Sequence, residues 1–147
     1  MQRSAHGLTR VELAIIMAVF CAVAAGAIPS YKRMMIDARR LVARTFLTQI
    51  AAKQEQYFSE HKTYAGDLLA LGYPTAIITF DGGRTLMTAS NKAATYTISL
   101  SITGPRTYTI AATPINGQAT ADIDCGTLTL TQAGQKTASG SNTATCW

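Results

Sequence analysis

Residues 8–31 read LTRVELAIIMAVFCAVAAGAIPSY. Residues 13–28 carry no charge, and together with the residues before them they are long enough to cross a hydrocarbon core of about 30 Å as a helix. Glu12 interrupts this apolar stretch near its start. Because a bare carboxylate at membrane depth costs roughly 2.5 kcal/mol or more, we expect Glu12 to meet a partner there.

The segment in front of that stretch, MQRSAHG, is short and basic and ends in Gly7. An ordinary secretory signal would be cut after its apolar run, and Ala22 to Gly26 offer small residues for such a cut. The sequence favours a cut after Gly7 instead, because no A-x-A signal precedes a plausible mature start. A cut at that position leaves the apolar run on the mature protein.

These residues resemble the type IV pilin family, in which a prepilin peptidase cuts after a leader glycine. The resemblance implies cleavage between Gly7 and Leu8 and N-methylation of Leu8. It also implies that Glu12, at the fifth mature position, compensates the amino-terminal charge of a neighbouring subunit. Pro29 falls where the family carries a helix-kinking proline.

Two positions depart from the family pattern. Leu8 stands where phenylalanine is usual, and Arg10 stands where an aliphatic residue is usual. Arg10 brings a second charge near Glu12 and could pair with it or reach the lipid headgroups. A generic single-span anchor with a stray acid is the alternative interpretation.

The pattern after Tyr31 predicts an amphipathic helix over residues 32–63. Such a helix packs its apolar side on a sheet and leaves its charged stripe in solvent; a grip on nucleic acid or lipid phosphate is the alternative for the basic residues. The apolar side holds Met35, Val42, Phe46, Ile50 and Tyr57, and the charged stripe holds Arg33, Asp37, Arg40, Arg44, Glu55 and Lys62.

The pattern of apolar residues changes to a period of two beyond residue 74. Residues 95–102 alternate without error, which turns Tyr96, Ile98, Leu100 and Ile102 to one face. Residues 108–112 and 127–131 alternate in the same way, and 75–80 form a shorter candidate strand. We therefore predict an α+β fold in which a long amino-terminal helix packs on a small antiparallel sheet. The expected segments are a leader (1–7), a membrane and assembly helix (8–31), its amphipathic continuation (32–63) and a head (64–147).

The three cysteines divide between the two ends of the chain. Cys125 and Cys146 lie in the region presented to an oxidising compartment, so pairing between them is favoured. Cys21 lies in the apolar run and is assigned no role. His61 has no neighbours with zinc spacing, so we expect neither a metal nor a cofactor.

The distal segments carry a narrower resemblance. Residues 124–130 read DCGTLTL, residues 134–136 read GQK, and the chain continues to Cys146-Trp147. With QEQYF at 54–58, they are similar to PilE-type minor pilins. The resemblance implies that the disulfide-bounded region, residues 125–146, lies on the exterior of a fibre.

The favoured function is therefore a structural minor pilin that enters type IV pili through its helix and primes or supports their assembly for twitching motility and adhesion. The implied partners are major and minor pilins, prepilin peptidase and the inner-membrane assembly platform. The implied location is the bacterial inner membrane before assembly and the pilus on the cell surface afterwards.

Three other functions compete with this one. A DNA-uptake pilin of the competence type should cluster cations on its head, but residues 64–147 hold four cations against four acids, so DNA is the less favoured partner. A type II secretion pseudopilin shares the leader but seldom the disulfide. An anchored enzyme lacks support, because no paired carboxylates, phosphate loop or nucleophile elbow is present. The cations in question are Arg84, Lys92, Arg106 and Lys136.

Overall fold

The computed structural model describes residues 9–87, 90–104, 106–141 and 143–147, except for the side chains of residues 27, 29 and 144. Within these residues the chain forms one long helix, a six-stranded antiparallel sheet and two short helical segments, and it divides into two compact units, residues 1–35 and 36–147. The elements are α1 (Arg10–His61), β1 (Ile77–Phe80), β2 (Leu86–Met87), β3 (Tyr96–Gly104), β4 (Thr107–Pro114), α2 (Asn116–Ala121), β5 (Leu128–Thr131), β6 (Lys136–Ala138) and η1 (Thr143–Thr145).

The first unit is the apolar part of α1. Its large side chains, such as Leu13, Phe20 and Val23, are more than half exposed. Among the described helices, α1 is the one that is long and apolar enough to cross a membrane. So much exposed apolar surface requires lipid or other helices to cover it, as the sequence predicts.

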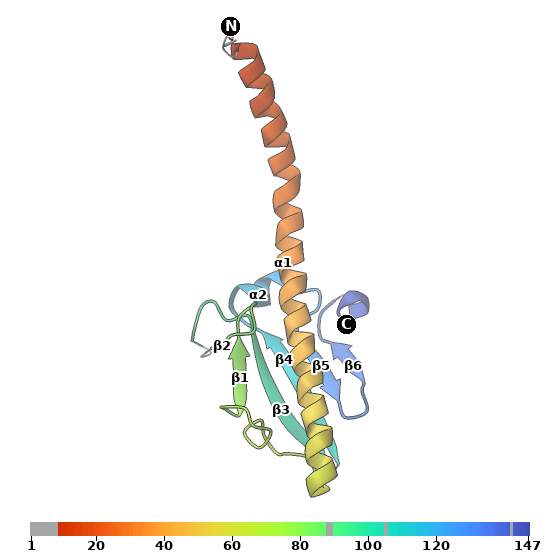
Figure 1. Cartoon of the computed structure of the whole chain (residues 1–147). Coiled ribbons are helices and arrows are strands. Elements are labelled where there is room, and N and C mark those ends of the chain that lie inside the picture. Colours follow the sequence, from red (N-terminus) through yellow and green to blue (C-terminus); the bar gives the residue numbers. More distant parts are fainter. Residues whose placement is uncertain (1–8, 88–89, 105, 142) are drawn as a thin grey trace, which may run out of the picture. The chain divides into compact units, whose positions relative to one another are not determined.

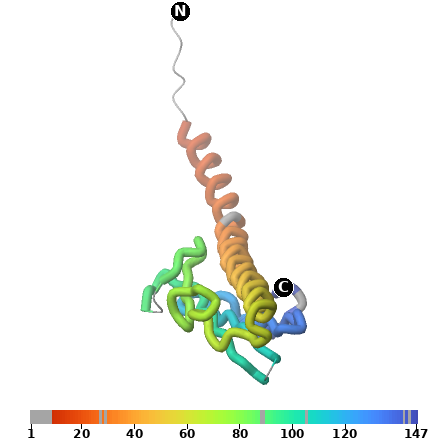
Figure 2. The backbone as a smooth tube through the Cα atoms, turned by 60° about the horizontal axis from the view of Figure 1, so that its bottom comes forward, coloured from red at the N-terminus to blue at the C-terminus, as the bar shows by residue number. Residues whose placement is uncertain are grey.

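The sheet of the second unit has the strand order β2-β1-β3-β4-β5-β6 (Figure 1). The predicted hairpin of β3 and β4 forms its centre, with Leu100 opposite Ile110. Strands β1 and β2 lie to one side of the second half of α1, and β5, β6 and the carboxyl-terminal segment lie to the other side, as Figures 1 and 2 both show. The α+β prediction is therefore confirmed, whereas β2, β6 and α2 were not predicted.

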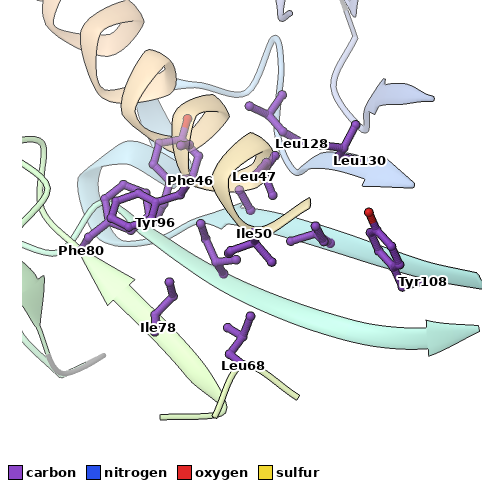
Figure 3. Close-up of a cluster of buried hydrophobic side chains, with 14 of the residues drawn as sticks. Phe46, Leu47, Ile50, Leu68, Ile78, Phe80, Tyr96, Tyr108, Leu128 and Leu130 are labelled. Carbon is purple, nitrogen blue, oxygen red and sulfur yellow. The ribbon is translucent and has the colours of Figure 1, made fainter. Parts of the chain in front are cut away.

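The core lies between the second half of α1 and one face of this sheet (Figure 3). The rings of Phe46 and Phe80 are tilted by 32° with centroids 4.5 Å apart, and the rings of Phe80 and Tyr96 stack with centroids 6.0 Å apart. Each large side chain that is fully buried here contributes roughly 1.5–3 kcal/mol. The inward side chains of the strands include Ile78, Phe80, Tyr96, Ile98, Tyr108, Ile110, Leu128 and Leu130.

Three predicted positions differ from the structure. Ile102 shares the inward face of β3 but is 42% exposed, and it lies near the end of the strand. Arg40 was expected on a solvated stripe, yet it is 8% exposed, and Arg44 is half-buried. A helical period identifies a common face but cannot show that a charged face meets a partner from elsewhere in the chain.

Arg40 is buried because its guanidinium binds the carboxylate of Asp122, which lies 82 residues further along the chain. The Nη2 and Nε atoms of Arg40 donate to the two Asp122 oxygens at 2.5 and 3.2 Å. Tyr96 donates its hydroxyl to the same carboxylate at 2.5 Å, and Gln118 donates to it at 3.3 Å. The hydrogen bond to Asp122 raises the pKa of Arg40, and burial raises the pKa of Tyr96. Arg40 therefore stays cationic at physiological pH, and Tyr96 stays a neutral phenol that can donate to the carboxylate.

This network joins three elements of the second unit, residues 36–147. Arg40 belongs to α1, Tyr96 to β3 and Gln118 to α2. The backbone carbonyl of Asp122 accepts hydrogen bonds from the amides of Cys125 and Gly126, at 3.3 and 2.8 Å. The carboxylate of Asp122 thus fixes α1 to the sheet, while its carbonyl fixes the start of the segment that leads into β5.

We expect Asp122→Ala to destabilise the head by about 3–5 kcal/mol, because it leaves the guanidinium of Arg40 buried without its main partner. Asp37→Ala is the matched control. Asp37 pairs with the same arginine at 3.0 Å, but its side chain is 63% exposed, so its loss should cost less than about 1 kcal/mol. Denaturant unfolding of the full chain in detergent measures both losses, and equal losses would show that the buried pair contributes no more than an exposed one.

Candidate functional site

Glu12 belongs to the first turn of α1, where its carboxylate accepts hydrogen bonds from Thr9. The amide and the hydroxyl of Thr9 donate to Oε2 of Glu12 at 2.8 and 2.9 Å, and the Glu12 amide donates to the Thr9 hydroxyl at 3.2 Å. This reciprocal arrangement is a capping box, which satisfies two amides at the start of the helix. The Thr-x-x-Glu spacing signals it in the sequence, and the sequence reasoning missed it.

The structure describes only some of the other residues that were predicted to act in processing and assembly. Gly7 and Leu8 lie outside the described residues. Arg10 makes no ion pair with Glu12 among the residues that the structure describes. Pro29 lies within the span of α1, and the kink assigned to it stays a prediction.

The predicted disulfide between Cys125 and Cys146 is present, with Cα atoms 5.5 Å apart. Both cysteines are fully buried. Gly140 donates its amide to the carbonyl of Cys125 at 2.9 Å, and a Cβ on Gly140 would lie 2.1 Å from the carbonyl oxygen of Asp124. Only glycine allows this close approach of the two backbones.

The indole of Trp147 covers the outer edge of the sheet beside this disulfide. Its Nε1 donates to the carbonyl of Thr137 on the edge strand β6 at 2.8 Å, and the Nζ of Lys136 lies 5.4 Å from the centre of its ring. An edge strand with free backbone groups invites pairing with other chains. The carboxyl-terminal segment therefore closes this edge of the sheet.

Replacing both Cys125 and Cys146 by serine should lower the free energy of unfolding by about 3 kcal/mol, as expected for a closed loop of about 20 residues. The sequence separation of the two cysteines is 21. Cys21→Ser is the control, because Cys21 is a free and exposed cysteine of the first unit. Thermal unfolding with and without a reductant measures the difference, and an unchanged midpoint of the double variant would show that the loop is held by its hydrogen bonds alone.

The four predicted DNA contacts are all exposed, and the fold does not gather them into one cluster. Arg84 lies in the β1–β2 turn and Lys92 in the β2–β3 loop; the amide of Thr95, after that loop, bonds to the carbonyl of Phe80, before that turn. Arg106 lies in the β3–β4 turn, at the opposite end of β3. Lys136 starts β6 opposite Leu130, which pairs with Ile110 and through it lies level with Leu100 in the middle of β3. The structure thus brings Arg84 and Lys92 to one end of the sheet and leaves Arg106 and Lys136 apart from them and from each other.

The carboxylates that balance these cations by count are largely engaged within the head. Asp122 is buried against Arg40. Asp81 is half-buried and accepts the amides of Gly83 and Thr85 at 2.8 Å each. Asp67 is half-buried and accepts the amide of Ala70 at 2.9 Å. Of the four acids in residues 64–147, Asp124 is exposed, while the other three are buried or half-buried.

One further cation joins the pair at the β1–β2 turn. A Cβ on Gly82 would lie 3.1 Å from Cγ of Arg39, so the Arg39 side chain runs along this turn. Its Nη1 lies 3.5 Å from Oε1 of Gln118. Within the described part of the chain, the ion pairs are those of Arg40 with Asp37 and Asp122. At this end of the sheet Arg39, Arg84 and Lys92 outnumber one acid, Asp81 of the same turn. Arg39 lies outside residues 64–147, so a count over that range leaves it out.

The described residues hold no group of three or more His, Cys, Asp or Glu side chains that could bind a metal ion.

An amino-terminal helix with an exposed apolar segment, an antiparallel sheet packed on its second half and a disulfide at the carboxyl-terminal end define the class of the type IV pilins. Over residues 29–129 the chain matches the family described as type IV minor pilin ComP, DNA uptake sequence receptor. This match covers more than half of the 147 residues, and the chain belongs to this family of minor pilins. No curated protein matches the chain.

The family assignment confirms the predicted type IV minor pilin, while the narrower similarity to PilE-type pilins has no support in the match. It also agrees with the DNA-uptake alternative rather than with the favoured function in assembly, motility and adhesion. The sequence placed DNA binding below pilus assembly because residues 64–147 hold equal numbers of basic and acidic side chains. The structure weakens that argument, because Asp122 is paired with Arg40, which lies outside residues 64–147; Asp67 and Asp81 accept only backbone amides, which cancel no charge.

Proposed function

We propose that this chain is a DNA-uptake minor pilin whose head binds the phosphate backbone of duplex DNA. The family match over residues 29–129 is the observation that carries the proposal. The exposed cations Arg84 and Lys92, with Arg39 beside them, supply the positive charge that phosphate contacts require. No catalytic step is part of this function, so we expect no enzymatic activity.

The apolar part of α1 would hold the protein in the inner membrane after prepilin peptidase cleavage and then in the pilus among other pilins. Such a transfer from lipid into a fibre keeps the exposed side chains of the first unit covered throughout. Binding at the head and assembly through the helix use different residues. The priming of assembly, twitching motility and adhesion stay predictions beside the uptake function.

The double variant Arg84→Gln, Lys92→Gln should weaken DNA binding and flatten its salt dependence. If each side chain contacts one phosphate, the slope of log K against log salt falls by about 0.9 for each, or about 1.8 together. The measurement is fluorescence anisotropy of a labelled duplex with the full chain in detergent, over a range of salt concentrations.

Lys62→Gln is the control for this experiment. Lys62 is exposed and follows the carboxyl end of α1, where it donates to the carbonyl of Ser59 at 3.0 Å. Its loss should leave the slope unchanged. An unchanged slope in the double variant, or the absence of duplex binding by the wild-type chain at low salt, would rule out the proposed role of the two cations.

The charge of Glu12 should matter for assembly separately from its helix cap. Glu12→Gln can keep the capping box, since glutamine serves in that position, but it lacks the charge that would pair with a neighbouring amino terminus. We expect this variant to enter sheared pili about tenfold less or worse. Thr9→Ala keeps the charge and loses the cap, and it should enter pili almost normally. The reverse order of the two variants in immunoblots of sheared pili would show that the cap, and not the charge, is needed.

A further inference from the structure

The face of the sheet that α1 does not cover is lined mainly by hydroxyl groups, with Ile77, Met87 and Ala111 as apolar members. Strand register turns alternate residues of each strand outward, opposite to the buried Tyr96, Ile98, Ile110 and Leu128. We call these outward side chains the hydroxyl face. Its central members are Thr97, Ser99 and Ser101 of β3, Thr109 and Thr113 of β4, and Thr129 of β5.

Neighbouring hydroxyls of this face bind one another across the strands. The Oγ1 atoms of Thr79 and Thr97 are 3.3 Å apart, those of Thr127 and Thr113 are 3.5 Å apart, and Thr129 bonds to Thr137. A hydroxyl is both a donor and an acceptor, so each pair still has one proton to offer outward. The face can therefore donate hydrogen bonds to an anionic or polar ligand.

The charge around the hydroxyl face suits an anionic ligand. None of the six strands contains Asp or Glu, so no carboxylate projects from the strands themselves. Cations stand at both ends of β3: Arg84 and Lys92 at its start, and Arg106 at its end. This pattern combines hydroxyl donors in the middle with positive charge at the two limits.

The length of the face also fits a duplex. At about 3.3 Å per residue, the nine residues of β3 span about 27–30 Å. One turn of duplex DNA is about 34 Å long. A duplex lying along β3 and β4 therefore reaches the cations at both ends with phosphates separated by slightly less than one turn.

We propose that duplex DNA lies along β3 and β4 on the hydroxyl face, with its phosphates contacting Arg84 and Lys92 at one end and Arg106 at the other. This inference rests on the proposed function, since it assigns the path of the duplex that the head binds. The Ser and Thr hydroxyls of the two strands donate to phosphate oxygens between the cations, as such side chains commonly do in protein–DNA complexes. The face covered by α1 takes no part.

The experiment places a negative charge on the hydroxyl face and measures duplex binding by the full chain in detergent. Ser101→Glu and Thr113→Glu alter exposed positions on β3 and β4. Each should raise the Kd for the duplex about tenfold at low salt. Gln49→Glu is the matched control on the exposed side of α1; it adds the same charge and should change the Kd less than about twofold.

Valine variants keep the test decisive if a glutamate variant does not fold. Thr109→Val with Thr129→Val removes two hydroxyls while keeping the shape and the strand preference of the side chains, and it should raise the Kd about threefold or more. Wild-type affinity in all the folded face variants, with loss of affinity in Arg84→Gln, Lys92→Gln, would overturn the proposed path and leave the proposed function standing. If the wild-type chain binds no duplex, the proposed function fails, and the path fails with it.

Discussion

The carboxylate of Asp122 is the group on which the arrangement of the head depends. It is buried, and it receives hydrogen bonds from Arg40, Tyr96 and Gln118, which come from three different elements. A buried carboxylate is stable only where charge and hydrogen bonds replace its hydration. The helix, the sheet and the segment leading to the disulfide must therefore all be in place before Asp122 can be buried. The buried ion pair of Arg40 and Asp122 adds little net stability. It forms only when these three elements are in one arrangement, so it specifies that arrangement.

The same pair changes the electrostatics of the surface. It removes one acid from the exterior, and the β1–β2 turn engages a second acid, Asp81, through its amides. The exposed cations of the head keep their charge without ion pairs among the described residues. A head that is neutral by count thus has exposed cations near both ends of β3 and no charged side chain on the outward face of β3 and β4 between them. This arrangement agrees with membership in a family of DNA uptake receptors.

The strands that were predicted correctly are those in which apolar and polar residues alternate over at least four or five positions. Residues 95–102 and 108–112 lie in β3 and β4, and 127–131 correspond to β5. Strands β2 and β6, of two and three residues, are too short to show a period, and α2 has no capping side chain to announce it. The disulfide was predicted because Cys125 and Cys146 are the two cysteines of the region presented to an oxidising compartment. The four cations were named from the sequence, but their places in the sheet depend on turns and on a strand register that only the structure defines.

The sequence by itself determined the apolar helix, the α+β class, the pairing of Cys125 with Cys146 and the likeness to type IV pilins, because these rest on local periodicity, composition and short motifs. The tertiary structure alone decided the place of Arg40 and the state of the acids. The partner of Arg40 lies 82 residues away, and helical periodicity contains no information about so distant a contact. Net charge is likewise a sum over residues, whereas binding depends on which charges remain at the surface after folding has engaged the others.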